Sequence, residues 1–213
     1  MKKFYQLKIQ VKRIRPSIYR TIIVPENITF LKLHSYIQTL FGLEDYHLWQ
    51  FNKGGHFDST IISLDADEDD FLDFYNKKLK AKETKINEML LDVKDKLEYW
   101  YDFGDDWLMN VEIQKIFSKN ELPKKVDKIP FVLKAKGPML LEDVGGTYMF
   151  PDCIRLFDYL KSNIELTTKE INSWEETIFR IIGDNSEGED WKKLYIALFS
   201  DLYKTDWNNF VLE

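Results

Sequence analysis

The sequence predicts an α+β fold: a mixed or antiparallel sheet, with helices on one face and a helical C-terminus. Three observations support this prediction. Apolar and polar side chains alternate over residues 4–12, which indicates a half-buried strand. An apolar stripe at helical spacing follows after residue 29, and helical spacing returns after residue 167. Strands that precede a run of helices are typical of an α+β protein.

The first two elements are predicted to form a β-hairpin. Residues 4–12 are its first strand, and one face of that strand carries Tyr5, Leu7, Ile9 and Val11. Pro16 ends the strand because proline has no N–H to donate to the ladder. The segment IYRTIIV at 18–24 is rich in β-branched residues and is predicted to be the second strand.

A helix and a third strand come next. Thr29 is predicted to cap the helix, and Gly42 is predicted to end it. The buried stripe of this helix comprises Phe30, Leu33, Ile37, Leu40 and Phe41. The third strand is predicted over 46–51, with one face made by His47, Trp49 and Phe51. The order strand–strand–helix–strand resembles the start of a β-grasp fold.

The acidic run DADEDD at 65–70 is predicted to be a loop. It begins like a calcium-binding EF-hand loop, but its sixth position is Asp70 instead of glycine and its twelfth is Asn76 instead of glutamate. Short helices are predicted over 70–80 and 84–91.

A second hairpin is predicted around the stretch YWYDFGDDW at 99–107. Residues 96–103 and 107–116 both alternate, with inward faces made by Leu97, Tyr99, Tyr101 and Phe103, and by Trp107, Met109, Val111 and Ile113. The connection is Gly104-Asp105-Asp106, and Gly104 is predicted to adopt a positive φ. The two aspartates are expected to be turn residues, because their carboxylates can accept nearby backbone N–H groups.

The remaining chain is predicted to be mainly helical. Residues 131–136 are predicted to be a strand, and 137–148 are predicted to be irregular with a break at the paired glycines. Helices are predicted from Pro151 to Leu160, after a capping box of Thr167 with Glu170, and over 191–203. We expect residues 1–213 to form one domain, with a family-like core over about 5–160 and a helical segment over about 161–213.

The composition bounds the class of protein. The chain has 213 residues, a net charge of −6 and a single cysteine, Cys153, which excludes an intramolecular disulfide and suits a reducing compartment. Its alternating N-terminus lacks the apolar core of a signal peptide, and no segment reaches the roughly 18 apolar residues of a membrane span. We therefore expect a cytoplasmic protein that does not bind membranes.

Positive charge is concentrated at the N-terminal hairpin. There is no acidic residue before Glu26, whereas the same segment carries Lys2, Lys3, Lys8, Lys12, Arg13 and Arg15. This asymmetry can indicate a protein or nucleic-acid partner at the hairpin. A solvated face with internal ion pairs is the favoured alternative, because exposed lysines are common. Arg20 lies in an otherwise apolar strand, so we expect its guanidinium to be buried and paired with a carboxylate, most directly that of Asp102.

Four segments together resemble the plasmid pRiA4b ORF-3-like family: residues 5–25, 33–51, 99–107 and 142–146. The third segment, YWYDFGDDW, is the most specific of them. The resemblance covers about residues 5–160 and implies a small α+β domain of unknown biochemical activity, carried on plasmids and mobile elements. Members commonly have histidine where this chain has Met109, and often cysteine where it has Val144. The resemblance implies that any His/Cys metal site of the family has been lost here.

The candidate site residues are polar and aromatic side chains of these segments: Arg20, His47, Trp49, Asp102, Asp105, Asp106, Trp107, Glu142 and Asp143. If the loops at 102–106 and 142–146 meet, their carboxylates can bind a hard cation. Alternatively, Asp102 pairs with Arg20 and the other carboxylates cap turns. No cofactor and no transition metal is expected, because zinc, copper and nickel sites usually recruit imidazole or thiolate, and His47 supplies one nitrogen at most.

Two functions remain open on the sequence. The first is a non-catalytic interaction module associated with mobile-element or plasmid-borne genes. The second is a metal-assisted hydrolase that uses the acidic loops and His47. The sequence has no P-loop, nucleophile elbow or HExxH pattern, and positions 109 and 144 lack histidine and cysteine, which favours the first. Convergence of the two acidic loops on a concave pocket would favour the second.

Overall fold

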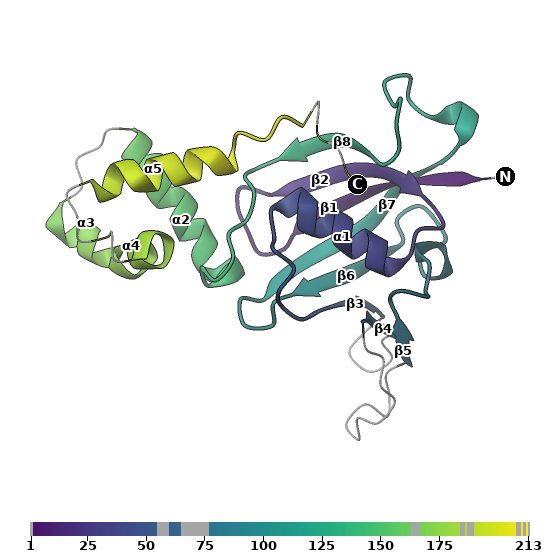
Figure 1. Ribbon diagram of the computed structural model, residues 1–213, viewed down its shortest axis with the longest axis horizontal. Coiled ribbons are helices and arrows are strands. Elements are labelled where there is room, and N and C mark those ends of the chain that lie inside the picture. Colours follow the sequence, from purple (N-terminus) through teal and green to yellow (C-terminus); the bar gives the residue numbers. More distant parts are fainter. Residues whose placement is uncertain are drawn as a thin grey trace.

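The computed structural model describes residues 2–54, 60–64, 77–162, 167–183, 186, 190–207, 210 and 212. The described residues form an eight-stranded sheet with the strand order β5-β4-β3-β6-β7-β1-β2-β8 (Figure 1). Neighbouring strands are antiparallel except β4 and β5, so the sheet is mixed. The strands are β1 Lys3–Val11, β2 Tyr19–Pro25, β3 Trp49–Lys53, β4 Thr60–Ser63, β5 Lys77–Lys80, β6 Lys96–Tyr101, β7 Trp107–Ser118 and β8 Phe131–Lys136.

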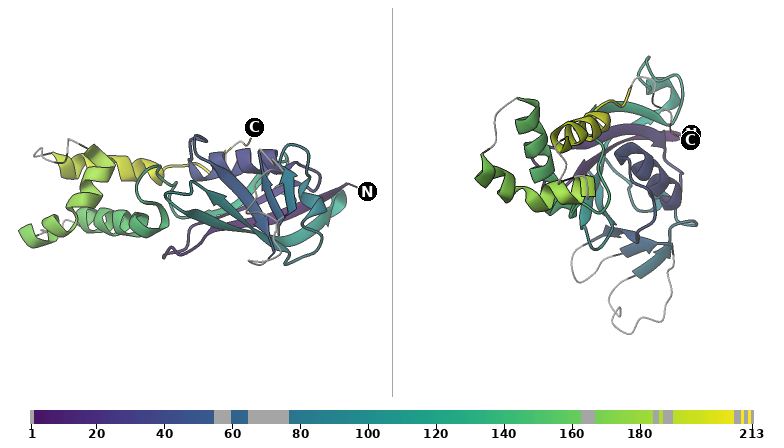
Figure 2. Two further views of the ribbon diagram at one scale, coloured as in Figure 1. Left: turned by 90° about the horizontal axis from the view of Figure 1, so that it is seen from below. Right: turned by 60° about the vertical axis from the view of Figure 1, so that its left-hand side comes forward.

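The helices complete the predicted α+β fold. The first helix packs across one face of the sheet, and the later helices lie together beyond one end of it (Figures 1 and 2). One of these later helices, α3, begins at the predicted capping box of Thr167 and Glu170. The helices are α1 Phe30–Phe41, α2 Gly146–Lys161, α3 Thr168–Ser173, α4 Glu175–Ile182 and α5 Trp191–Leu202, with short 3-10 turns η1 Ile86–Glu88 and η2 Lys119–Glu121.

The core lies between α1 and the sheet. Thr29 caps α1 by accepting the N–H of Lys32 at 3.2 Å, and Gly42 ends the helix with a φ of 73°, both as predicted. The inward side chains of both predicted hairpins are buried, including Leu7, Ile9, Tyr99, Tyr101, Trp107, Met109 and Val111. Removing these apolar surfaces from water is the main stabilising term of the fold.

The C-terminal helices are joined to the sheet through aromatic contacts. The rings of Phe150 in α2 and Trp107 in β7 have their centroids 5.6 Å apart. The Tyr195 hydroxyl of α5 donates to the carbonyl of Cys153 in α2 at 3.0 Å. α2 is therefore held between β7 of the sheet and α5.

Several predicted element boundaries are wrong. β3 begins at Trp49 instead of residue 46, so His47 lies on a loop. Phe103 is exposed because the strand before it ends at Tyr101. α2 begins at Gly146 and contains Pro151, which we expected to open the helix. In the first two cases a loop replaces predicted strand, and in the third a helix replaces predicted irregular chain.

The region between β4 and β6 also differs from the prediction. Residues 77–80, expected to end a helix, form β5 because they pair with β4 in a parallel ladder. The helix expected over 84–91 is reduced to η1. The acidic run at 65–70 lies outside the described residues.

Arg20 is fully buried, as predicted, but its predicted partner is wrong. Its guanidinium donates to the carbonyl oxygens of Tyr19, Leu40, Lys136 and Pro138 at 2.7–3.0 Å. The guanidinium also lies over the rings of Phe41 and Trp207, at 4.9 and 4.5 Å from their centroids. Backbone acceptors thus replace Asp102, and burial lowers the pKa of Arg20 to about 9.

Candidate functional site

Four connections meet at one end of the sheet: the β1–β2 turn, the α1–β3 loop, the β6–β7 turn and the β8–α2 loop (Figure 1). Backbone hydrogen bonds join them. The N–H of Asp102 donates to the carbonyl of Leu48 at 2.9 Å, and the N–H of Leu140 donates to that of Phe41 at 2.7 Å. The two acidic loops that the sequence singled out therefore come together beside the α1–β3 loop.

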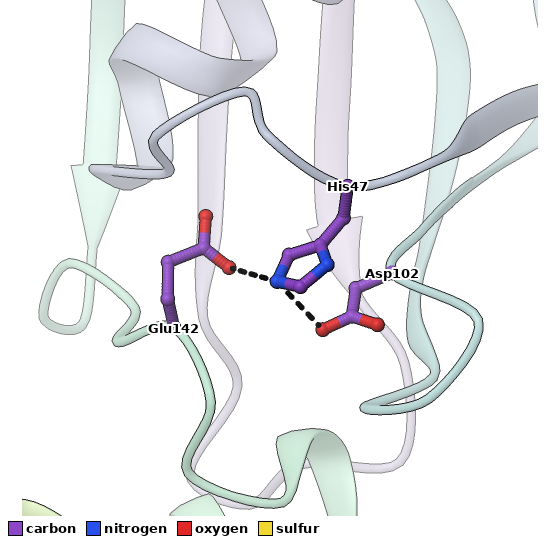
Figure 3. A group of neighbouring side chains, drawn as sticks. All are labelled: His47, Asp102 and Glu142. Atoms are coloured by element: carbon purple, nitrogen blue, oxygen red, sulfur yellow. Dashed lines mark ion pairs between the residues drawn. The ribbon is translucent and has the colours of Figure 1, made fainter.

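His47, Asp102 and Glu142 lie at the centre of this arrangement (Figure 3). Nε2 of His47 is 3.4 Å from Oδ2 of Asp102 and 3.9 Å from Oε2 of Glu142. Oδ1 of Asp143 is also 3.4 Å from the same nitrogen. One potential ligand atom from each of His47, Asp102 and Glu142 lies within 4.8 Å of the other two. A single ion can contact all three.

Asp102 is oriented by its own turn. Its Oδ1 accepts the N–H groups of Gly104 at 3.0 Å and of Asp105 at 3.3 Å. The other oxygen, Oδ2, is left to face His47. Asp102 itself has a φ of 51°.

Glu142 and Asp143 repeat this pattern. Oε1 of Glu142 accepts the N–H of Glu44 and the hydroxyl of Tyr101, both at 2.8 Å. Oδ2 of Asp143 accepts the hydroxyl of Tyr46 at 2.7 Å. In both residues the remaining oxygen faces the imidazole. Each carboxylate is thus fixed by one oxygen and presents the other to the same point.

The atoms that face one another are buried without hydrogen bonds. Nε2 of His47 and Oε2 of Glu142 have no hydrogen-bond partner among the described residues. The side chain of Glu142 is only 7% exposed and that of Asp102 10%, whereas Asp143 is 68% exposed. Burial raises the pKa of Glu142, so an added positive charge here would stabilise its ionised form.

Asp105 joins the two acidic loops. Its carboxylate accepts the N–H of Gly145 at 3.1 and 3.2 Å. A Cβ on Gly146 would lie 1.5 Å from the carbonyl oxygen of Asp105, so the approach of the two backbones requires glycine there. Burial and then the charge of Asp102 raise the pKa of Asp105. The paired glycines therefore start α2 against the turn.

The predicted conformation of the turn is wrong. Asp102 and Asp106 adopt positive φ angles of 51° and 54°, whereas Gly104 does not. Aspartate tolerates the left-handed region better than most residues because its short side chain can hydrogen-bond locally. Asp102 does so here through Gly104 and Asp105.

A buried network of hydrogen bonds anchors the α1–β3 loop to α1 and β6. His34 places Nδ1 2.8 Å from the hydroxyl of Tyr99 and Nε2 2.7 Å from Oδ1 of Asp45. Gln38 donates to the same hydroxyl at 2.8 Å and accepts the N–H of Asp45 at 3.0 Å. Desolvation lowers the pKa of His34, and Asp45 opposes that shift. The network fixes the loop that carries His47.

The other candidate residues have different roles. Trp107 is buried against Phe150 in the core. Trp49 stacks on His34, with ring centroids 3.8 Å apart. Asp106 forms an ion pair with Arg13 on the β1–β2 turn. The candidates that meet are His47, Asp102, Glu142 and Asp143.

Sequence reasoning missed the residues that orient the carboxylates. Tyr46 and Tyr101 were expected only to be strand residues, yet both donate to the acidic cluster. The available signal was that each tyrosine directly precedes a candidate residue, His47 and Asp102.

The N-terminal cations are partly neutralised. Lys12 pairs with Glu98, and Arg13 pairs with Asp106. Four other predicted cations form no ion pair with any side chain in the described ranges: Lys2, Lys3, Lys8 and Arg15.

No described helix combines the length and the apolar composition needed to cross a membrane.

Comparison with known proteins places these features in a family. The uncharacterized protein y4hQ of Sinorhizobium fredii is 26% identical over 155 residues, which are 72% of this chain and 73% of that protein. The crystal structure of a protein of unknown function, MM3350 from Methanosarcina mazei Go1, matches with a TM-score of 0.64 and 28% identity, covering 86% of this chain and 92% of that chain. The family model for plasmid pRiA4b ORF-3-like proteins matches residues 3–182, which reaches beyond the expected limit near 160. The chain therefore belongs to the plasmid pRiA4b ORF-3-like family.

Proposed function

We propose that the protein binds one divalent cation between His47, Asp102 and Glu142 and uses it in metal-assisted hydrolysis. One observation carries the proposal: three carboxylates, those of Asp102, Glu142 and Asp143, are each held through one oxygen and turn the other toward Nε2 of His47. Hydrogen bonds that orient ligating carboxylates in this way are characteristic of metal sites.

The spacing of the facing atoms suits a small cation. Ligand distances of about 2.0–2.2 Å place neighbouring ligand atoms about 2.8–3.6 Å apart in octahedral or tetrahedral geometry. The separations from Nε2 of His47 are 3.4 Å to Asp102, 3.4 Å to Asp143 and 3.9 Å to Glu142. The two separations of 3.4 Å already lie in this range, and a contraction of about 0.3 Å brings the separation to Glu142 into it.

A protonated imidazole is the competing explanation for the acidic cluster. An imidazolium N–H would form a charge-assisted hydrogen bond of about 2.7–2.9 Å to one carboxylate. The shortest separation is 3.4 Å, and Nε2 has no hydrogen-bond partner in the part of the chain described. This geometry favours a cation between the groups.

The ligand set favours manganese. Carboxylates suit magnesium, calcium and manganese, whereas an imidazole nitrogen suits transition metals. Manganese is itself a transition metal, so this proposal departs from the expectation that no transition metal binds, which rested on the lack of histidine and cysteine at positions 109 and 144. The experiment below tests the two against each other.

Three protein ligands would leave coordination positions for water and substrate, as in catalytic metal sites. A bound divalent cation polarises a substrate oxygen and lowers the pKa of bound water. Asp143 is the exposed carboxylate of the group, so it is positioned to accept a proton. A cleft of about 560 Å³ beside His47, also lined by Tyr46, Leu48 and Phe103, offers access for a substrate.

The test is a cation titration of the full chain after dialysis against EDTA. We expect calorimetry to give one Mn²⁺ per chain, and we expect His47→Gln, Asp102→Asn and Glu142→Gln each to weaken binding at least tenfold. At 100 times the dissociation constant, Mn²⁺ should stabilise the wild-type protein by about 2.7 kcal/mol.

Asp127→Asn is the matched control, because Asp127 is an exposed carboxylate between β7 and β8, at the opposite end of β7 from the centre. It should bind Mn²⁺ like the wild type. Absence of stoichiometric binding would reject the proposal. Binding without Mn²⁺-dependent hydrolysis of p-nitrophenyl acetate, p-nitrophenyl phosphate or bis-p-nitrophenyl phosphate would reject the hydrolase for these ester classes and retain a cation-binding protein.

An interaction module is the second candidate function. It is favoured by the cations of the β1–β2 hairpin that lack ion pairs with described residues, notably Lys8 and Arg15. A link to mobile elements or plasmid-borne genes and a cytoplasmic location stay predictions.

A further inference from the structure

The face of the sheet opposite α1 carries cations on β1 and β8, the two strands that flank β2. Lys8 of β1 pairs in register with Thr21 of β2, which pairs with Lys134 of β8. One step along, Gln10, Tyr19 and Lys136 form a second row. Residues in register on neighbouring strands share a face, and so do residues two apart. The β8 lysines lie more than a hundred residues from the hairpin, so sequence reasoning did not include them.

Tyr19 lies at the centre of this charge. Nζ of Lys8 is 4.9 Å from the centroid of its ring, and Nζ of Lys134 is 5.6 Å away. The neighbouring ammonium of Lys134, followed by the charges of Lys136 and Lys8, lowers the pKa of Tyr19. The surroundings of this ring therefore favour negative charge.

A groove continues the same surface toward α2. Its volume is about 620 Å³, and its polar lining includes Gln10, Lys12, Arg13, Arg15, Asn110 and Arg155. Gln10 belongs both to this groove and to the Tyr19 row, so the two parts are contiguous. We call the combined surface the cationic face: Lys8, Lys12, Arg13, Arg15, Tyr19, Lys134, Lys136 and Arg155.

Acidic groups offset only part of this charge. Lys12, Arg13 and Arg155 pair with Glu98, Asp106 and Asp152, respectively. These pairs are at least partly exposed, so phosphate oxygens can replace the carboxylates at little cost. Glu112 is the register neighbour of Lys8. Four cations have no ion pair within the described residues: Lys8, Arg15, Lys134 and Lys136.

We propose that the cationic face binds single-stranded nucleic acid. Its lysines and arginines suit a phosphate backbone, and the ring of Tyr19 and the amides of Gln10 and Asn110 suit unstacked bases. An acidic peptide would use the charges but has no planar base to stack on the ring. The groove is large enough for a ligand of nucleotide size. This surface is independent of the proposed cation centre.

The test is fluorescence anisotropy of the full chain with labelled oligo(dT)20 in EDTA-containing buffer. If the protein neutralises four phosphates, raising NaCl from 50 to 200 mM should weaken binding about 50-fold. Lys134→Glu with Lys136→Glu should weaken binding at 50 mM at least tenfold. The matched control is Lys124→Glu with Lys125→Glu, an equal charge change at exposed positions between β7 and β8. This control should remain within twofold of the wild type.

The outcomes separate this proposal from the others. Absence of binding at 50 mM, or an equal loss in both double variants, would overturn it. Equal affinity for a 20-base-pair duplex, for polyglutamate or for vesicles of phosphatidylserine would overturn the assignment to single strands. Glu142→Gln should bind the oligonucleotide like the wild type, so failure of the cation centre leaves this result unchanged.

Discussion

Gly146→Ala is expected to force the two acidic loops apart. Gly146 has a φ of 53°, and an added Cβ would lie 1.5 Å from the carbonyl oxygen of Asp105. The left-handed conformation costs about 1–2 kcal/mol with a Cβ. Overpacking adds about 1–3 kcal/mol. Reduced freedom of the unfolded chain offsets about 0.4–1 kcal/mol. We expect the free energy of unfolding to fall by about 3 kcal/mol.

Gly183→Ala supplies the matched control. Gly183 has a φ of 56°, but no other heavy atom lies within 4 Å of its added Cβ. Its ψ of −137° lies outside the left-handed helical region, in a conformation that residues other than glycine rarely adopt. This variant should therefore lose about 1–2 kcal/mol, which is the conformational strain without the collision. The assay is urea unfolding followed by tryptophan fluorescence, together with the Mn²⁺ titration. Equal losses in the two variants, or unchanged Mn²⁺ affinity in Gly146→Ala, would refute the claim that this contact holds the two acidic loops together.

Three further variants test other parts of the fold. Arg20→Met should cost more than about 3 kcal/mol in urea unfolding, because four backbone carbonyl groups lose their charged donor; a loss below about 1 kcal/mol would contradict that role. Burial raises the pKa of Asp105, so the stability that this group contributes is present below its ordinary pKa of 3.8 and is lost as the pH rises through the raised value. Asp105→Asn should remove this pH dependence and change the free energy of unfolding at pH 7 by less than about 1 kcal/mol. Burial lowers the pKa of His34, so the stability that this group contributes is present above pH 6.5 and is lost as the pH falls through the lowered value. His34→Gln should therefore reduce the dependence of the urea midpoint on pH below pH 6.5. An unchanged dependence on pH would exclude a buried neutral imidazole.

The sequence predicted those strands and helices whose evidence lies within the element itself, as alternating side chains or as caps at its ends. Alternation identified β1, β6 and β7, and the cap at Thr29 with the glycine at 42 bounded α1. β5 could not be found in this way, because its pairing partner β4 and the parallel ladder between them are tertiary features. The loop before β3 was likewise missed, because residues 46–48 continue the alternation of the strand that follows.

The residues of the candidate site could be named from the sequence, but their arrangement could not. His47, Asp102 and Glu142 are separated by at least forty residues in sequence, and their meeting depends on the strand order and on the contact of Asp105 with Gly145. The predicted partner of Arg20 was wrong because every residue has a backbone carbonyl, so the sequence does not indicate which carbonyls will accept from the guanidinium. Positive φ was assigned to Gly104 because the sequence does not reveal that Asp102 caps its own turn.

The strand at the β5 edge of the sheet bears on how the protein resists aggregation. An edge strand exposes unpaired backbone groups to which a second chain can add, and short, lysine-rich edges discourage that addition. β5 has four residues, and three of them are lysines: Lys77, Lys78 and Lys80. A second copy that extended the sheet through its own β5 would bring these like charges side by side across the new ladder. Growth of the sheet from chain to chain is thus opposed at this edge by the residues that form it.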